Sequence, residues 1–126
     1  MIEIYDKKGF DKLVSMDGNS LVGADLSGKT LENGNFIQMD LHGANFSNAN
    51  LKDADLRLCN LQGAIFTGAN LNSADLSGAD LSGAQLQDAI LTAAKLSGTK
   101  ISLTNLPQLS QAENVNLDEI QISQGT

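Results

Sequence analysis

Every fifth residue of this chain is large and apolar from Leu21 to Leu106, without one interruption. These positions hold Leu, Phe or Ile. The residue two places before each of them is small, in most cases Ala, with Cys59 in that place in one unit. The residues in between and after are mostly polar or Gly. Divided at the small residue, positions 24–108 give 17 five-residue units, so the chain is an internal repeat of period five.

A period of five fits neither ordinary secondary structure. On an α-helix, a step of five rotates by roughly 140° and spreads the leucines around the circumference. On a straight strand, an odd step puts successive leucines on opposite faces. Two residues after the apolar position, many units carry Gly, Asn or Asp, as at Gly28, Asn48 and Asp53. These residue types tolerate the positive φ of tight turns, so we expect one turn per unit, with the small and large apolar residues inside.

The units resemble the A-(D/N)-L-x-x consensus of the pentapeptide-repeat family, and ADLSG itself occurs three times. The resemblance covers residues 19–108. It implies an all-β solenoid, a right-handed quadrilateral β-helix with four units in each coil and about four and a half coils in the chain. At the ~4.8 Å spacing of paired strands, that is a rod roughly 20 Å long. A left-handed β-helix of the hexapeptide acyltransferases would need a period of six, which this sequence lacks.

Residues 1–20 are expected to form an N-terminal cap, because the end of a solenoid exposes core and unpaired backbone. Ile2 and Ile4 alternate like a short strand. Asp6 could cap a short helix over residues 7–16, which would give the solenoid a helical cap. The repeat itself is assigned to residues 21–108.

Residues 109–126 are expected to form a C-terminal cap and tail. Pro107 can open one helical turn that places Leu109 over the last coil. After it, residues 115–119 and 120–124 look like two degenerate units, displaced from the earlier phase, in which strand-like pairing resumes. The final Gln-Gly-Thr is expected to be disordered.

Composition and charge narrow the function. The chain of 126 residues carries 15 acidic and 8 basic side chains, a net charge of −7. That balance argues against direct nucleic-acid binding and against contact with an anionic membrane surface. No apolar run approaches the ~18 residues of a membrane span. With a single cysteine, no intrachain disulfide is possible, and a cytoplasmic protein is the expectation.

The sequence predicts no catalytic, cofactor or metal site. His42 is the one histidine, and it falls at an outward position with no second histidine or acid pair in its unit. Cys59 takes the place of an inward Ala, where it is interpreted as a small buried apolar residue rather than a nucleophile. We therefore expect that the protein is not an enzyme.

Two sets of outward residues are candidates for binding a partner. With twenty residues per coil, Asp55 and Asp75 fall on one face, and Asp40 and Asp80 on the adjacent face. They could form an acidic stripe for a basic partner. The plainer interpretation is that Asp or Asn before the leucine is simply the repeat consensus and keeps the surface soluble.

The second set is apolar. Ile37 and Leu58 occupy outward places that are usually polar, on one face and one coil apart. A small exposed patch of this kind could bind a partner or a second copy, although scattered apolar residues on a surface are normal.

Taken together, the sequence favours a non-catalytic structural or protein-interaction module with an unknown protein partner, monomeric or weakly dimeric. The alternative follows from the resemblance, since some members of the family mimic DNA and inhibit or protect gyrase. Residues 24–108 hold eight acids against five bases, a net of −3. A duplex has one charge per ~1.7 Å, so a ~20 Å mimic would need about a dozen. DNA mimicry is therefore the minor hypothesis. The family is abundant in cyanobacteria, which suggests such a source.

Overall fold

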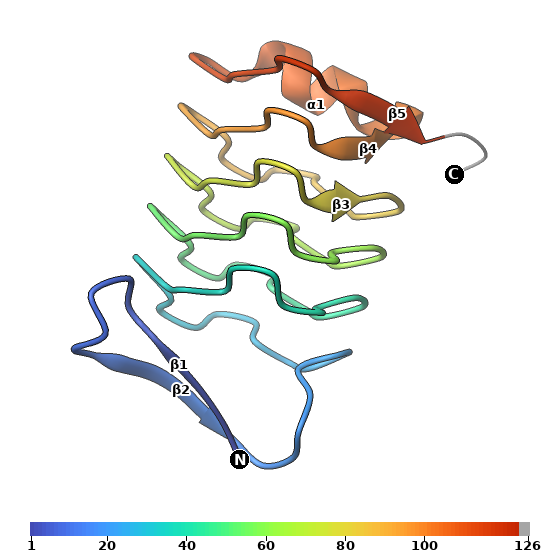
Figure 1. Ribbon diagram of the computed structural model, residues 1–126. Helices are drawn as coiled ribbons and strands as arrows, with labels where there is room; N and C mark the ends of the chain where they lie inside the picture. Colours follow the sequence, from blue (N-terminus) through green and yellow to red (C-terminus); the bar gives the residue numbers. More distant parts are fainter. Residues whose placement is uncertain (124–126) are drawn as a thin grey trace.

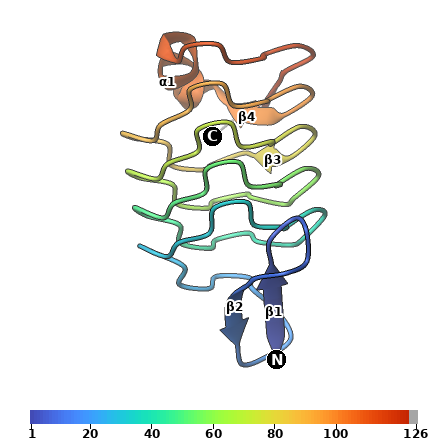
Figure 2. The same ribbon diagram turned by 90° about the vertical axis from the view of Figure 1, so that its left-hand side faces the viewer.

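The computed structural model describes residues 1–123, and at positions 110 and 111 the backbone alone. The chain winds in stacked, roughly rectangular circuits, each called a coil below (Figure 1). A two-stranded hairpin lies at the N-terminal end of the stack, and α1 and β5 lie at the opposite end (Figures 1 and 2). The expected disorder of Gln124 to Thr126 lies outside the described residues.

Successive coils pair in parallel at a spacing of twenty residues. Four ladders of isolated bridges run along the stack. They comprise positions 25–45–65–85, 30–50–70–90, 35–55–75–95 and 40–60–80, and the last continues through β3 (Asp80–Leu81) to β4 (Lys100–Ser102). Each bridge is backed by backbone hydrogen bonds between neighbouring coils, such as Leu56 N–H to the Asp75 carbonyl at 2.8 Å. Twenty residues divided by the period of five gives four units in each circuit.

The five-residue period fills the interior. The leucine position is fully buried through the middle of the stack, from Leu26 to Leu86. Three of its members are phenylalanines. The Phe46 and Phe66 rings stack with centroids 5.1 Å apart at 3°, and Phe36 meets Phe46 edge-on at 6.1 Å. The small position is also buried in most units, Cys59 included, at 2% exposure. The predicted inward placement of both positions is confirmed.

The turn residues adopt the predicted left-handed backbone. Gly28, Asn48 and Asp53 have φ of 68°, 59° and 60°. The structure imposes the same conformation on less suited residues, namely Gln38, Leu58, Ser73 and Ala93, whose φ lies at 60–61°. An L-residue with a Cβ is held there at a cost of about 1–2 kcal/mol. The repeat geometry therefore overrides local preference at these four corners.

The N-terminal prediction was half right. β1 (Ile2–Tyr5) confirms the expected strand, but the helix predicted over residues 7–16 is wrong: a turn and β2 (Lys12–Met16) stand there, paired antiparallel with β1. The turn breaks any helix, since Gly9 has φ of 79°. Asp6 does accept the Phe10 N–H through its carboxylate at 2.8 Å, but that bond closes a hairpin turn instead of capping a helix.

The hairpin packs on the first coils. Ile4 and Val14 face each other across the pair and are buried at 3% and 5% exposure. Backbone bonds from Lys7 N–H to the Asn33 carbonyl (2.8 Å) and from Asn35 N–H to the Tyr5 carbonyl (2.9 Å) tie it to the stack. Burial of Ile4 and Val14 therefore comes from alternation along two strands and not from one face of a helix.

At the C-terminal end the coil changes course. After β4, a 3₁₀ turn η1 (Leu103–Asn105) leads into α1 (Leu106–Gln111), and Leu109 is buried at 1% exposure. The predicted helical turn is thus confirmed, but it begins at Leu106, inside the range 21–108 that was assigned to the repeat. Strand pairing then resumes as predicted: residue 95 pairs with 116, and β5 (Gln121–Ser123) pairs with β4. These pairs are 21 residues apart, so the helix adds one residue to the circuit.

Candidate interaction surfaces

All four predicted acidic residues point outward from the ladders, but the fold itself uses their carboxylates. In each, Oδ1 accepts the backbone N–H two residues further on: the partners are His42 for Asp40 (3.3 Å), Arg57 for Asp55 (3.1 Å), Ser77 for Asp75 (3.0 Å) and Ser82 for Asp80 (2.9 Å). Asparagines do the same, as Asn70 does for Asn72 N–H at 3.0 Å. An Asp or Asn before the leucine therefore holds the turn that follows it. Sequence reasoning missed this structural role.

Three of these carboxylates also make hydrogen bonds or ion pairs with neighbouring side chains. Arg57 donates to both oxygens of Asp55, from Nε at 2.9 Å and Nη2 at 2.8 Å. This guanidinium holds the pKa of Asp55 below its usual value, against the effect of burial. His42 Nδ1 lies 2.9 Å from Asp40, and Gln62 Nε2 lies 2.6 Å from Asp80.

The ladders do align the acids as predicted, but they do not form an unbroken stripe. Asp55 and Asp75 are direct neighbours, and the ladder continues to Lys95. Asn60 separates Asp40 from Asp80, and the next member on that ladder is Lys100. Asp55 is 8% exposed and paired with Arg57, and Asp75 is itself half-buried. A basic partner would find little continuous negative surface here.

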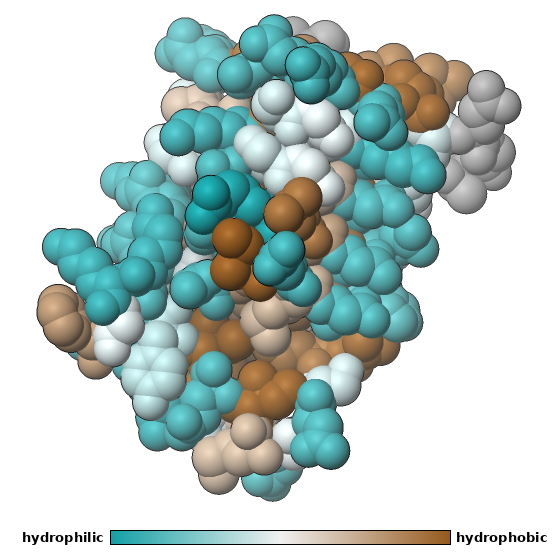
Figure 3. Space-filling view, in the orientation of Figure 1, coloured by the Kyte–Doolittle hydropathy of each residue, from teal (hydrophilic) through white to brown (hydrophobic). Residues whose placement is uncertain are grey.

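The apolar pair Ile37 and Leu58 lies at one corner of two neighbouring coils. Gln38 N–H donates to the Arg57 carbonyl at 2.8 Å, which sets Ile37 beside Arg57 and Leu58 beside Gln38. Their exposures are 37% and 55%. On the face shown in Figure 3, hydrophobic side chains form separate areas between hydrophilic ones. The two exposed side chains thus lie diagonally across two neighbouring coils, and they are called the Leu58 patch below.

Leu58 differs from the other members of its turn position in a way the sequence did not reveal. Its φ of 60° places a bulky aliphatic residue where most units carry Gly, Asn or Asp. Its side chain lies over Gly78 of the next coil: a Cβ on Gly78 would come within 2.6 Å of Leu58 Cδ2. More than half of the side chain nevertheless remains in solvent. Burial of the side chain therefore does not offset the backbone strain.

Cys59 lies inside, as predicted. Its Sγ donates to the Phe36 carbonyl at 2.9 Å. Thr99, which takes the same unit position two coils further along, donates in the same way from Oγ1 to the Leu76 carbonyl at 2.8 Å. Burial raises the pKa of the Cys59 thiol to about 11. Among residues 1–123, no group of three or more His, Cys, Asp or Glu side chains could hold a metal ion. No helix in the same range is long and apolar enough to cross a membrane.

A model of pentapeptide repeats matches this sequence in eight copies, over residues 20–57, 54–92 and 69–106. The chain belongs to the pentapeptide-repeat family. Pentapeptide-repeat proteins are right-handed β-helices that generally serve as structural or interaction modules, and the twenty-residue ladders of this chain agree with that fold. No curated protein matches the sequence.

Several solved pentapeptide-repeat structures are similar to this one. A protein of the Arabidopsis thaliana thylakoid lumen is 33% identical, with a TM-score of 0.51, over 80% of this chain and 59% of the other. Rfr23 of the cyanobacterium Cyanothece 51142 is 32% identical, with a TM-score of 0.45, over 79% and 60%. This chain therefore spans about three fifths of the length of either protein.

A more distant similarity is to QnrB1, a plasmid-mediated fluoroquinolone resistance protein. It is 20% identical, with a TM-score of 0.39, over 79% of this chain and 80% of the other. At that distance the likeness carries no argument about what this pentapeptide-repeat protein does.

Proposed function

We propose that this pentapeptide-repeat protein is a non-catalytic protein-interaction module, which presents side chains at the corners of a rod of about four and a half coils. Residues 1–20 and 109–126 would serve as its N-terminal cap and its C-terminal cap and tail, with residues 21–108 as the rod. Its partner is a protein rather than a nucleic acid or a membrane, and the chain itself is a monomer or weak dimer. The single buried cysteine suits a cytoplasmic location, although the Arabidopsis relative is a lumenal protein.

The strained, exposed Leu58 carries this proposal. Residues held in costly backbone regions persist where the surrounding structure fixes them, and they gather at functional sites. Gly would relieve the strain at this corner, as it does at Gly78 on the same column. An aliphatic side chain that remains 55% exposed is instead available to a partner, together with Ile37. The paired acids Asp40, Asp55, Asp75 and Asp80 are secondary candidates, because their Oδ1 atoms already hold turns.

The test compares Leu58→Gly with Ala93→Gly. Both substitutions relieve a left-handed corner at φ of 60°, so neither should lower stability by much, but only the first removes the exposed aliphatic side chain. Each variant is cross-linked in extracts of the source cells, and captured proteins are quantified by mass spectrometry. We expect a specific partner that Ala93→Gly retains and Leu58→Gly loses. Equal capture by both variants would show that the Leu58 patch is not the contact surface.

The charge arrangement counts against the DNA-mimic alternative. Arg57 neutralises Asp55, and Lys95 and Lys100 follow the acids on both ladders. We expect no inhibition of gyrase supercoiling at micromolar protein. Strong, salt-sensitive inhibition would replace the interaction-module proposal with DNA mimicry.

A further inference from the structure

The last coil forms an edge of the stack. In Figures 1 and 2, residues 113–123 (red) make up the outermost layer at the C-terminal end, with α1 beside them. Two ladders reach this layer, at residues 116 and 121. A strand at an edge presents backbone groups with which another strand can pair. The edge over residues 115–122 is therefore a continuation of the pairing that joins every coil to the next.

Each regular unit on the ladder to residue 116 directs two N–H donors and one carbonyl acceptor toward the following coil. Leu96 N–H donates to the Asn116 carbonyl at 2.9 Å, and the Ala94 carbonyl accepts the Asn116 N–H at 3.2 Å. Gly98 N–H donates to the Asp118 carbonyl at 2.9 Å. The same three bonds join the earlier coils on this ladder, so the pattern is a property of the unit.

The equivalent groups of the last unit have no hydrogen-bond partner among residues 1–123. They are the N–H groups of Leu117 and Glu119 and the carbonyl of Val115. The turn of this unit is nevertheless complete, because Asp118 N–H donates to Asn116 Oδ1 at 2.9 Å. The backbone is thus already in the conformation with which a further strand would pair, and such preorganisation lowers the entropic cost of binding.

Two apolar positions are also uncovered at this edge. Leu117 and Ile122 are 37% and 40% exposed. Leu96 and Ile101, which hold the same positions one coil earlier, are fully buried. An added strand with an apolar residue over Leu117 would remove this surface from water, as each coil does for the leucines of the coil before it.

The charge of the last coil is of one sign. The charged residues of positions 112–123 are all acidic, namely Glu113, Asp118 and Glu119. None of the three forms an ion pair within the described part of the chain. A second copy docked edge to edge would bring the same carboxylates against them. Charge therefore disfavours the pairing of two copies and favours a basic strand.

Asp118 and Glu119 form a corner, called the acidic corner below. Backbone bonds place residues 97–98 and 77–78 at this corner in the two preceding coils, and both are Ser-Gly pairs without charge. The lysines of the preceding coil, Lys95 and Lys100, lie instead on the ladders of residues 116 and 121. A Lys or Arg placed over the acidic corner by an added strand would therefore face two carboxylates.

We propose that the last coil binds an extended segment of a partner protein as one further strand, parallel to residues 115–122. The segment places an apolar residue over Leu117 and Lys or Arg over the acidic corner. Its backbone accepts from the N–H groups of Leu117 and Glu119 and donates to the Val115 carbonyl, as the coils do among themselves. This inference rests on the proposed interaction role, but the contact is backbone pairing at the end of the rod and not the Leu58 patch.

The test uses the full chain and the acetylated peptide ANLKGANLKG, which is two units of the repeat pattern with lysine after each leucine. Titrations followed by ¹⁵N–¹H correlation spectra locate the bound peptide and give its dissociation constant. We expect saturable shifts at residues 115–122 and weaker binding as salt rises. The amides of Leu117 and Glu119 should exchange with solvent more slowly in the complex, because they donate to the peptide.

Changes in the peptide separate backbone pairing from charge. N-methylation of both asparagines removes the donors that lie over the Val115 and Ile120 carbonyls, so it should abolish binding. N-methylation of the first alanine is the control, because the N–H at that unit position bonds within its own coil, as Ala94 N–H does to the Leu91 carbonyl at 3.0 Å. The peptide ANLEGANLEG should bind at least about tenfold more weakly than ANLKGANLKG.

A first pair of chain variants tests the apolar contact. Leu117→Ser should weaken peptide binding by about tenfold, and it should keep the fold because Leu117 already meets solvent. Leu58→Ser makes the same change at an exposed leucine outside the last coil and should bind the peptide like the natural chain. Ser73 has the φ of 60° that Leu58 has, so a serine is accommodated there.

A second pair tests the charge. Asp118→Asn with Glu119→Gln should weaken binding of the lysine peptide by about tenfold and reduce its salt dependence. Gln38 adopts the left-handed backbone that position 119 requires. Asp53→Asn with Asp88→Asn removes the same amount of charge from other corners, where asparagine tolerates the positive φ, and should bind like the natural chain.

The proposal is overturned if the peptide leaves the Leu117 and Glu119 amides unprotected, or if the glutamate or asparagine-methylated peptide binds as well. A dimer that forms through residues 115–122, detected by sedimentation, would mean that a second copy takes the edge, and would also overturn it. If Leu58→Gly loses partner capture while no peptide binds, this inference alone fails and the proposed function stands. If the peptide binds but Leu58→Gly captures as much as Ala93→Gly, the Leu58 patch fails and the edge remains.

Discussion

The regular coils and the last coil are built from the same kind of unit but differ in burial. Residues 115–119, Val-Asn-Leu-Asp-Glu, reproduce the repeat in detail: Asn116 Oδ1 accepts the Asp118 N–H at 2.9 Å, and Glu119 has φ of 58°. Leu117 nevertheless remains 37% exposed, while Leu76 in the same unit position is fully buried. The turn is therefore a local property of five residues, whereas burial requires a coil on each side.

The largest expected difference concerns the core. Phe46→Ala removes a buried ring that contacts both Phe36 and Phe66, and should lower the free energy of unfolding by about 3–5 kcal/mol. Leu117→Ala in the last coil should cost less than about 1 kcal/mol, because its side chain already meets solvent. Urea unfolding followed by circular dichroism measures both values. Equal losses would mean that the last coil is as well packed as the middle.

A second difference should be visible without mutation. Leu56 N–H and Leu96 N–H make equivalent bonds, to the Asp75 carbonyl (2.8 Å) and the Asn116 carbonyl (2.9 Å). The acceptor of Leu96 belongs to the last coil, which we expect to open without global unfolding. Native-state hydrogen exchange should show the Leu96 amide exchanging at least about tenfold faster than that of Leu56. Matching rates would indicate that the whole stack opens as one unit.

The third difference depends on pH. Arg57 lowers the pKa of Asp55, so the folded chain binds that proton less readily than the unfolded chain. The resulting stabilisation is complete above the ordinary Asp pKa of about 4 and is lost as the pH falls through the lower pKa of the folded chain. Urea midpoints between pH 2 and 7 should fall at the acid end, and Asp55→Asn should flatten that fall. Asn keeps the turn acceptor, as Asn35 does on the same ladder. An unchanged profile would show that the Arg57 pair contributes nothing.

The smallest expected effects concern the corners. Ala93→Gly should raise the free energy of unfolding by about 0.5–1 kcal/mol, because Gly adopts φ near 60° without a Cβ penalty. Glu119→Gly makes the same change in the last coil and should alter global stability less, since that coil opens separately. Gly63→Ala is the reverse control: nothing lies within 4 Å of its added Cβ, so any loss reports backbone strain alone. A loss of stability in Ala93→Gly would contradict the strain at these corners.

Much of the stack could be predicted because each inward position depends only on the period. Leu and Ala recur at fixed places, and Gly or Asn marks each corner, so Leu56, Ala64 and Gly78 needed no knowledge of distant residues. The displaced unit at residues 115–119 was found by the same pattern. The N-terminal hairpin could not be predicted in this way, because Phe10 and Leu13 also fit one face of a helix. Residues 12–16 form a strand only because they pair with β1, and Phe10, which the helix would have buried, is 81% exposed.

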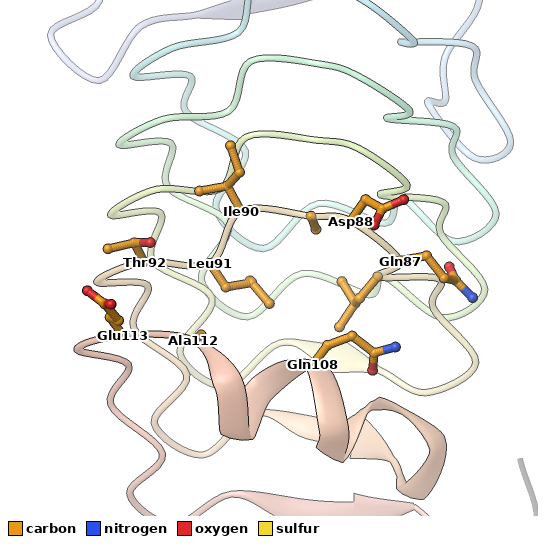
Figure 4. A pocket seen from close by; sticks show the side chains of 10 residues that line it. Gln87, Asp88, Ile90, Leu91, Thr92, Gln108, Ala112 and Glu113 are labelled. Carbon is orange, nitrogen blue, oxygen red and sulfur yellow. The ribbon is translucent and has the colours of Figure 1, made fainter.

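The candidate surfaces were less predictable for a different reason. The positions of Asp55 and Asp75 followed from the period, but their use as turn acceptors depends on side-chain geometry. The strain at Leu58 comes from its positive φ, which a leucine would not be expected to adopt. The cavity between residues 86–92 and α1 (Figure 4) exists because α1 replaces a strand there, and no repeat of period five describes that replacement.

The twenty-residue ladders have a consequence for how such a rod can change in length. Inserting twenty residues adds a whole layer, and each end keeps its own contacts and its orientation relative to the other. Inserting five lengthens the rod by a quarter of a layer and rotates one end by about a quarter turn about the axis. The spacing and the relative azimuth of two surface features, such as the Leu58 patch and the cavity beside α1, can thus be adjusted in discrete steps by copying units between them. A partner that contacts both features would therefore bind only rods in which the number of units between them is right.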